Sequence, residues 1–349
     1  MSFAKKIIEW YHEHQRDLPW RNTRDPYKIW LSEIILQQTR VEQGMPYYLR
    51  FVERYPDVLS FANASEDDIL HLWQGLGYYS RGRNMHKAAG IVQNEYQGEF
   101  PKTYVELIKL PGVGEYTAAA ISSFSNDEAQ AVLDGNVFRV LARYYGIDTP
   151  INTPAGKKIF TQLAKENLDL AHPAIYNQAI MDFGALHCKP KSPLCQECEL
   201  QLDCFANVNG LVADLPVKIK AKKSRNRYFH YFIIEQDDAI LMSKRGASDV
   251  WENLYEFPMI ETAEALDGLA ILASPEFIDL FGSEVGLSLL RTNKKHILSH
   301  QNIYATFYRI LSFKGLERKK TNWNYVLLKD LDKLAKHKLI FSFLETAKL

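Results

Sequence analysis

All four cysteines of the 349-residue chain fall in one stretch, CKPKSPLCQECELQLDC, which runs from residue 188 to residue 204. The gaps between successive cysteines are six, two and five residues. Cysteines clustered in this way usually crosslink their loop, either as disulfides or as ligands of a zinc ion or an iron–sulfur cluster. This loop therefore constrains the fold of the chain around it more than any other feature of the sequence.

The N-terminal sequence argues against disulfides. MSFAKKIIEWYHEHQ lacks the apolar segment and the cleavage site of a secretory signal, and no stretch reaches the roughly 18 apolar residues of a membrane span. We therefore expect a cytoplasmic protein whose thiols stay reduced. Zinc sites usually bring two short-spaced cysteine pairs, and only Cys195 and Cys198 form one here. The spacing predicts a metal centre and leaves zinc and iron–sulfur open.

A basic segment divides the chain. Residues 218–227, KIKAKKSRNR, hold six basic side chains and no acidic one, whereas the whole chain has a formal net charge of +0. The segment is either a solvated linker or a strap that faces phosphates. We predict an all-α domain over residues 1–215, a basic linker over 216–226 and an α+β domain over 227–349.

Apolar periodicity supports this division. Before the linker, Phe3, Ile7 and Trp10 are spaced as on one helix face, and a second helical pattern from Val137 to Tyr144 ends at Gly146. After the linker, four apolar runs predict strands and two segments predict helices. The predicted strands are residues 228–235, 239–245, 303–313 and 323–330, and the predicted helices are residues 274–285 and 341–349.

The tetrapeptide Pro111-Gly112-Val113-Gly114 joins two helical patterns. Its glycines permit a tight turn, and the helix that follows would present unpaired backbone N–H groups and the positive end of its dipole. Such a hairpin can bind one backbone phosphate. The sequence alone leaves an ordinary helix–turn–helix connection equally open.

Three motifs together carry a family resemblance. LPGVGEYTA, followed by Asp134 in VLDGNV, resembles the helix-hairpin-helix motif of DNA glycosylases, with the hairpin at residues 110–116. The cysteine loop is similar to the iron–sulfur loop of endonuclease III and MutY, and residues 19–41, PWRNTRDPYKIWLSEIILQQTRV, resemble the MutY family of adenine DNA glycosylases. The resemblance implies a [4Fe–4S] cluster held by Cys188, Cys195, Cys198 and Cys204.

Two carboxylates are the candidate catalytic groups. Glu33 has apolar neighbours at helical spacing, and it is either buried, where desolvation would raise its pKa as a general acid needs, or an exposed glutamate on an amphipathic helix. Asp134 is placed to cap a helix, where amide donors and the helix dipole should lower its pKa. By resemblance, Glu33 protonates adenine at N7, and Asp134 stabilises the sugar at C1′ with Tyr116 and Asn136 beside it.

The resemblance also assigns groups that reach and hold the base. Tyr116 stands where endonuclease III has its lysine nucleophile, which implies a monofunctional glycosylase. Gln38 and Tyr78 match the residues that are inserted into the duplex, and Gly112 and Gly114 match the DNA-binding hairpin. Arg81 and Arg83 could meet phosphate or remain solvated. The implied adenine pocket consists of Arg16, Trp20, Arg21, Leu36 and Gln178, whose carboxamide can pair with the N6 and N7 edge.

The C-terminal region resembles the Nudix-like domain of the MutY family. WENLYEFP is similar to the family's strand segment, but the glutamate-rich box that binds Mg²⁺ in Nudix hydrolases has no match. The resemblance therefore implies recognition rather than catalysis. The family's Phe-Ser-His loop, which reads 8-oxoguanine, corresponds here to Leu298, Ser299 and His300.

These features predict a base excision repair hydrolase that removes adenine opposite 8-oxoguanine or guanine in double-stranded DNA. We expect a monomer associated with the nucleoid. The alternatives are an endonuclease III-like glycosylase and abasic-site lyase, and a non-catalytic DNA-binding scaffold. Nudix-type nucleotide hydrolysis is disfavoured by the missing carboxylates.

Overall fold

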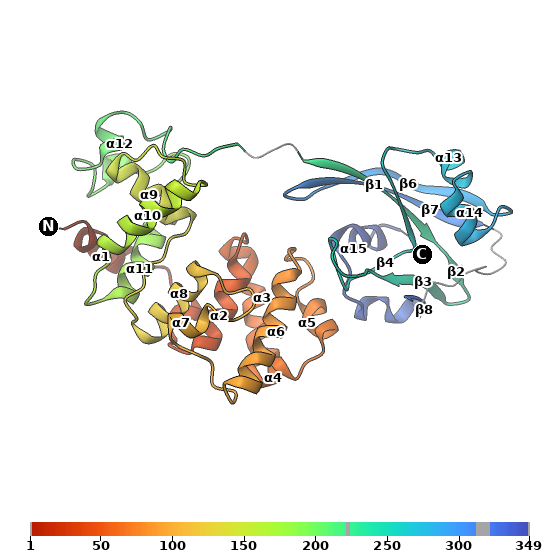
Figure 1. Ribbon diagram of the computed structural model, residues 1–349, viewed down its shortest axis with the longest axis horizontal. Coiled ribbons are helices and arrows are strands. Elements are labelled where there is room, and N and C mark those ends of the chain that lie inside the picture. Colours follow the sequence, from red (N-terminus) through yellow and green to blue (C-terminus); the bar gives the residue numbers. More distant parts are fainter. Residues whose placement is uncertain (1, 221–223, 312–321, 348–349) are drawn as a thin grey trace. The chain divides into compact units, whose positions relative to one another are not determined.

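A computed structural model describes residues 2–220, 224–311 and 322–347 of the chain (Figure 1). The chain divides into two compact units. The first unit consists of Met1–Asn63 and Asn84–Ala221, and the second consists of Ala64–Arg83 and Lys222–Leu349. Residues 221–223 of the predicted linker lie outside the described residues.

The first unit is helical, and its helix ends follow ordinary capping rules. Ser2 caps the first helix through its side chain, and Asp25 caps the second, in which Pro26 is the first residue. Gly146 ends α9 with a φ of 69°, so both helices predicted in this region are confirmed. The helices of this unit are α1 (Phe3–His14), α2 (Pro26–Leu36), α3 (Val41–Arg54), α4 (Val58–Ala62), α7 (Tyr104–Leu107), α8 (Glu115–Asn126), α9 (Gly135–Tyr145), α10 (Pro154–Glu166), α11 (Pro173–Asp182) and α12 (Phe205–Val208).

Helix α2 lies in the interior of the first unit. Nine of its eleven residues are buried, and it packs against α3 and α8. A helix that is apolar on nearly every side has to lie inside a protein rather than on its surface. Glu33 is therefore held within the core by the burial of its own helix.

The second unit is built from two four-stranded sheets. The first sheet has the order β5-β1-β7-β6, with β1 and β7 parallel, and in the second β3 pairs with β2, β4 and β8. Helices α5 (Glu66–Leu72), α13 (Gly268–Leu272), α14 (Pro275–Phe281) and α15 (Lys338–Leu344) belong to the same unit, whereas α6 (Ser80–Glu95) begins in it and continues in the first unit. The strands are β1 (Arg225–Ile233), β2 (Glu235–Gln236), β3 (Ala239–Lys244), β4 (Tyr255–Glu256), β5 (Met259–Thr262), β6 (Gly286–Ile297), β7 (Gln301–Leu311) and β8 (Trp323–Leu327).

All four predicted strands and both predicted helices of this region are present, but the strands β2, β5 and β6 and the helix α13 were not predicted. Among the described strands, β6 pairs with β7 alone at the edge of its sheet, and Leu289 on it is 57% exposed. An edge strand with cationic and exposed side chains lacks the apolar alternation that reveals a strand in a sequence. The ends of two predicted elements, at residues 312–313 and 348–349, lie outside the described residues.

Within the described residues, none of the helices combines the length and the apolar character required to cross a bilayer.

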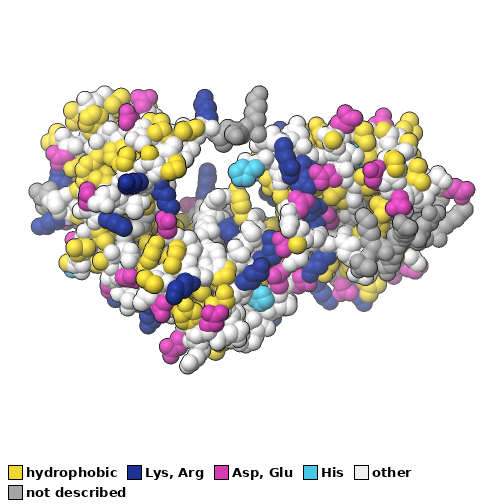
Figure 2. Space-filling model, in the orientation of Figure 1, with side chains coloured by type: hydrophobic (Ala, Val, Ile, Leu, Met, Phe, Trp, Pro, Cys, Tyr) yellow, Lys and Arg dark blue, Asp and Glu magenta, His cyan; other side chains and the backbone are white. Residues whose placement is uncertain are grey.

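Hydrophobic side chains gather on the α12 end of the first unit (Figure 2). Leu202 is 85% exposed there, and Phe205 and Val208 are also exposed. An apolar surface thus lies next to the cysteine loop.

Candidate active site

A cavity of about 670 Å³ opens in the first unit between α2, α8, α9 and α11. Its lining includes the four predicted catalytic side chains, the five predicted adenine-pocket side chains and Gln38. These residues lie as far apart in sequence as Arg16 and Gln178. The fold thus brings together a set that the sequence distributes over most of the unit.

Glu33 is 8% exposed and lies in this cavity. Burial raises its pKa to about 7; the hydrogen bond from Tyr116 opposes the shift, and the charge of Asp134 adds to it. The Tyr116 hydroxyl donates to Oε2 of Glu33 at 2.8 Å. The predicted rise of this pKa is confirmed, and a carboxyl with this pKa can hold a proton near neutral pH.

Asp134 caps α9. Its Oδ1 accepts the backbone N–H groups of Asn136 and Val137 at 2.9 and 2.8 Å, and its Oδ2 accepts Nδ2 of Asn136 at 2.8 Å. The predicted lowering of its pKa was wrong, because burial raises it and outweighs these donors. Among the described residues, Asp134 nevertheless receives three N–H donors and Glu33 one O–H donor, so Asp134 carries a negative charge more readily.

Asp182 was not predicted, although it organises one wall of the cavity. Its side chain is fully buried and accepts Nε of Arg16 at 3.1 Å and Nη2 of Arg21 at 2.7 Å. Burial alone would raise its pKa, but the two guanidinium groups hold the pKa below its ordinary value. A single acid in the apolar sequence of α11 was the only signal for this role.

Arg139 was also missed. It is 8% exposed and connects the Asp134 cap to the cysteine loop. Its guanidinium donates to the Asn136 side-chain oxygen at 3.0 Å, to the Gly184 carbonyl at 2.7 Å and to the Cys188 carbonyl at 2.8 Å. A charged residue on the buried face of a helix could have indicated it.

The hairpin between α7 and α8 has the predicted backbone. Gly112 has a φ of 79°, and a Cβ at this position would lie 2.9 Å from Cβ of Asn84. Gly114 is the N-cap of α8 and provides no side-chain hydrogen bond, and a Cβ there would meet open space. The first amides of α8 are therefore accessible to an anion.

The two residues expected to enter DNA share an unusual backbone. Gln38 has a φ of 56° and Tyr78 a φ of 47°, and Tyr78 is 51% exposed. A left-handed conformation costs a residue other than glycine roughly 1 kcal/mol or more, and such strain is concentrated at functional sites.

The two arginines that could meet phosphate both have protein partners. Arg83 donates to the Glu252 carbonyl at 2.8 Å, and Arg81 donates to the Gly77 carbonyl at 3.3 Å.

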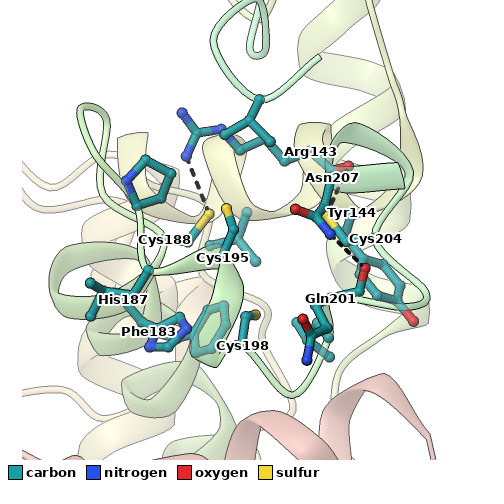
Figure 3. Close-up of a pocket in the computed structure, with 15 residues that line it drawn as sticks. Arg143, Tyr144, Phe183, His187, Cys188, Cys195, Cys198, Gln201, Cys204 and Asn207 are labelled. Carbon is teal, nitrogen blue, oxygen red and sulfur yellow. Dashed lines mark hydrogen bonds between the residues drawn. The ribbon is translucent and has the colours of Figure 1, made fainter. Parts of the chain in front are cut away.

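The four cysteines line one cavity, and Figure 3 shows Arg143 above Cys188. Nη1 of Arg143 donates to Sγ of Cys188 at 3.4 Å. Burial raises the pKa of the Cys198 thiol to about 12, and the neighbouring thiols add to this rise. Within residues 2–220, 224–311 and 322–347, no group of three or more Cys, His, Asp or Glu side chains is placed to hold one metal ion.

In the second unit, Tyr78 and Ser299 meet although 221 residues separate them, and their hydroxyl oxygens lie 2.7 Å apart. They line a cavity of about 650 Å³ with Trp251, His296 and His300. Ser299 and His300 are exposed at the turn between β6 and β7, whereas Leu298 packs partly into the core. The three predicted lesion-reading residues therefore border one recess.

Comparison with known proteins agrees with this architecture. Residues 31–166 match the HhH-GPD superfamily of base excision DNA repair proteins, and residues 230–346 match the NUDIX domain. The chain is 39% identical to an adenine DNA glycosylase of Buchnera aphidicola subsp. Baizongia pistaciae, over 74% of each chain. It is 40% identical to a human adenine DNA glycosylase, over 78% of this chain and 60% of that protein.

Among solved structures, a thermostable thymine-DNA glycosylase aligns with a TM-score of 0.56 and 29% identity. The alignment covers 59% of this chain and 95% of that one. The family of the chain follows from its sequence identity to these relatives, and the helical architecture and the carboxylate cavity agree with it. The chain belongs to the adenine DNA glycosylase family within the HhH-GPD superfamily.

Proposed function

We propose that this protein is a monofunctional DNA glycosylase that hydrolyses the N-glycosidic bond of adenine opposite 8-oxoguanine, and less rapidly opposite guanine. The observation that carries the proposal is the pairing of Glu33, whose pKa is raised to about 7, with Asp134 in one cavity. Breaking this bond requires a proton on the departing base and negative charge beside the sugar.

In the proposed reaction, adenine leaves the duplex and enters the cavity. Protonated Glu33 gives its proton to N7, which converts the base into a neutral leaving group. The C1′–N9 bond then breaks, and Asp134 stabilises the positive charge that develops on the sugar. Water adds to C1′ and gives up a proton to the Glu33 carboxylate, which restores the acid, and the products are free adenine and an abasic site.

The absence of an amine at position 116 supports a hydrolytic rather than a lyase reaction. Lyase chemistry needs a lysine or another amine to form a Schiff base with the sugar, and the phenol of Tyr116 cannot do so. The Tyr116 hydroxyl instead donates to Glu33. Strand breaks should therefore appear only after treatment with alkali.

Recognition of the opposite base is assigned to the recess around Ser299. Its exposed hydroxyl and the neighbouring imidazole of His300 can hydrogen-bond the N7–H and O8 positions that distinguish 8-oxoguanine from guanine. Tyr78 and Gln38 are proposed to enter the duplex, and their left-handed backbones support this role. The amides at the start of α8 are proposed to bind one phosphate.

A [4Fe–4S] cluster is the proposed cofactor of the cysteine loop. The thiolates of such a cluster bind separate irons, so they surround a space rather than converge on one point, and all four cysteines line one cavity. Four partly buried thiolates close together also require a cationic partner, which the irons would supply. When bound, the cluster would crosslink the loop and support the Arg139 contacts.

Iron analysis tests the cofactor. Purified protein should contain about four irons per chain, and Cys198→Ser should lose most of them. Gln196→Ala is the matched control, because Gln196 lies in the same loop and is exposed. Stoichiometric zinc in place of iron would contradict the proposed cofactor.

Single-turnover cleavage tests the reaction. Duplexes carrying adenine opposite 8-oxoguanine, guanine or thymine would be compared with and without alkali. The proposal expects alkali-dependent breaks at the adenine, fastest opposite 8-oxoguanine. Breaks without alkali would indicate a lyase, and tight binding without any release of adenine would indicate a DNA-binding scaffold.

A further inference from the structure

Gln178 is held from behind by a residue outside the cavity lining. Tyr11 on α1 is 4% exposed, and its hydroxyl donates to Oε1 of Gln178 on α11 at 2.8 Å. Gln178 itself lines the cavity next to the groups proposed to bind adenine. The hydrogen bond thus connects a core side chain to the surface that meets the base.

Tyr11 is suited to act as a fixed donor. The guanidinium carbon of Arg21 lies 5.7 Å from the centre of its ring, and Arg21 is in turn tied to buried Asp182. Burial also raises the pKa of Tyr11, so the hydroxyl keeps its proton. A protonated phenol in a packed position donates to a carbonyl oxygen more strongly than it accepts from an amide.

We propose that Tyr11 is a positioning residue that fixes the orientation of the Gln178 carboxamide and thereby makes the pocket select adenine over 6-oxopurines. The inference rests on the proposed adenine glycosylase function. With Oε1 directed to Tyr11, the amide offers its N–H₂ group and the second lone pair of Oε1 to the base. Without this hydrogen bond, the amide could rotate by half a turn and exchange its donor and acceptor.

The orientation matters because adenine and hypoxanthine have opposite patterns. Adenine presents a donor at N6 and an acceptor at N1, whereas hypoxanthine presents an acceptor at O6 and a donor at N1. An amide fixed in one orientation matches only one of them, and an unmatched polar pair in a closed pocket is disfavoured. Because N7 receives the proton of Glu33, the N1 and N6 edge is the one left for Gln178, in place of the N6 and N7 edge.

The test compares single-turnover excision of adenine and of hypoxanthine, each opposite 8-oxoguanine, by the full-length protein. Tyr11→Phe should lower the ratio of the adenine rate to the hypoxanthine rate roughly fivefold to tenfold, the worth of one hydrogen bond. Tyr176→Phe is the matched control, because Tyr176 lies on the same helix as Gln178, is 2% exposed and has a hydroxyl that finds no hydrogen-bond partner in the described part of the chain. It should leave the ratio unchanged.

A second experiment, in the Gln178→Glu variant, distinguishes orientation of the Gln178 amide by Tyr11 from a general structural effect of losing the Tyr11 hydroxyl. In Gln178→Glu the two carboxylate oxygens are equivalent, so adding Tyr11→Phe should change the ratio by less than about twofold. An unchanged ratio in Tyr11→Phe, even with both rates reduced, would overturn the inference. An equal fall in the Gln178→Glu background would also overturn it, because the effect would not pass through Gln178. Failure of the wild-type protein to release any adenine would overturn the proposed function as well.

Discussion

Buried Glu33 in the first unit and Asp249 in the second, whose side chain is 35% exposed, have different neighbours. In the first unit, Glu33 receives a hydroxyl hydrogen bond, and the nearby Arg21 is already paired with Asp182. In the second unit, Asp249 accepts Nη1 and Nη2 of Arg227 at 2.7 and 2.8 Å and also pairs with Arg245.

The two environments move the carboxyl pKa values in opposite directions. Burial raises the pKa of Glu33 to about 7, whereas the hydrogen bond from Arg227 holds the pKa of Asp249 well below its ordinary value. Arg227 and Arg245 are each 7% exposed. A carboxylate paired with two buried arginines therefore stays charged and serves as a scaffold, whereas a buried carboxylate without an unpaired cation beside it keeps a proton that it can give up.

The largest expected effect is that of Asp134→Asn. The amide keeps an oxygen that can cap α9, but it removes the negative charge beside the sugar. We expect single-turnover excision to fall by at least about 10³-fold. Binding of the mispaired duplex, measured by fluorescence anisotropy, should change by less than about threefold. Weakened binding with intact excision would contradict the role assigned to Asp134.

Glu33→Gln should make the protein inactive but more stable at high pH. The folded pKa of about 7 lies above the ordinary 4.5, so the contribution of Glu33 to stability is fully present below pH 4.5 and is lost as the pH rises through 7. The neutral amide avoids this loss. We expect a gain of up to about 3 kcal/mol in the free energy of unfolding at about pH 8 and almost none at about pH 4.5.

Urea unfolding followed by far-ultraviolet circular dichroism measures this difference, since that signal reports mainly on the helical first unit. A gain of the same size at both pH values would show that the amide stabilises by packing alone. A loss of stability at high pH would contradict the burial argument for Glu33.

Asp249→Asn should have the opposite effect on the second unit. Removing this carboxylate leaves two buried guanidiniums without one of their partners, at a cost of roughly 2 kcal/mol after allowance for the partial exposure of Asp249. The stability that Asp249 provides is present above its ordinary pKa of 3.8 and is lost as the pH falls through the lower folded value. Exposed Asp238→Asn is the control. Equal stability of the two variants in urea near neutral pH would contradict the scaffold role.

The smallest expected effect concerns the exposed recess of the second unit. Replacing Ser299 and His300 together with alanine should reduce the preference for 8-oxoguanine over guanine about fivefold to tenfold. Excision opposite guanine should change little, because the catalytic cavity is untouched. Ser283→Ala, also exposed on this unit, serves as the control in the same single-turnover assay. An unchanged preference would place lesion recognition elsewhere.

Local rules were sufficient for much of the first unit. The spacing of Phe3, Ile7 and Trp10 gave α1, and Gly146 marked the end of α9. The apolar neighbours of Glu33 left burial and exposure both open, the resemblance favoured burial, and α2 is indeed buried on nearly every side. Such features depend on residues that are close together in sequence.

Features that depend on distant residues could not be predicted in this way. The role of Asp182 needs two arginines more than 160 positions away, and the strand β6 is defined by its pairing with β7. The raised pKa of Asp134 also depends on distant residues, because these bury the carboxyl. The sequence reveals its amide donors but not the burial that outweighs them. Local sequence reveals donors that are close along the chain, such as the amides that Asp134 accepts, but neither distant partners nor burial.

The pH dependence of single-turnover adenine excision tests the central claim most directly. If Glu33 is the proton donor with a pKa of about 7, the rate should be highest below that pH and fall about tenfold for each unit above it. The decline reflects loss of the proton from Glu33, since Asp134 is needed in its charged form. A rate that stays constant from about pH 6 to about pH 9 would contradict the account.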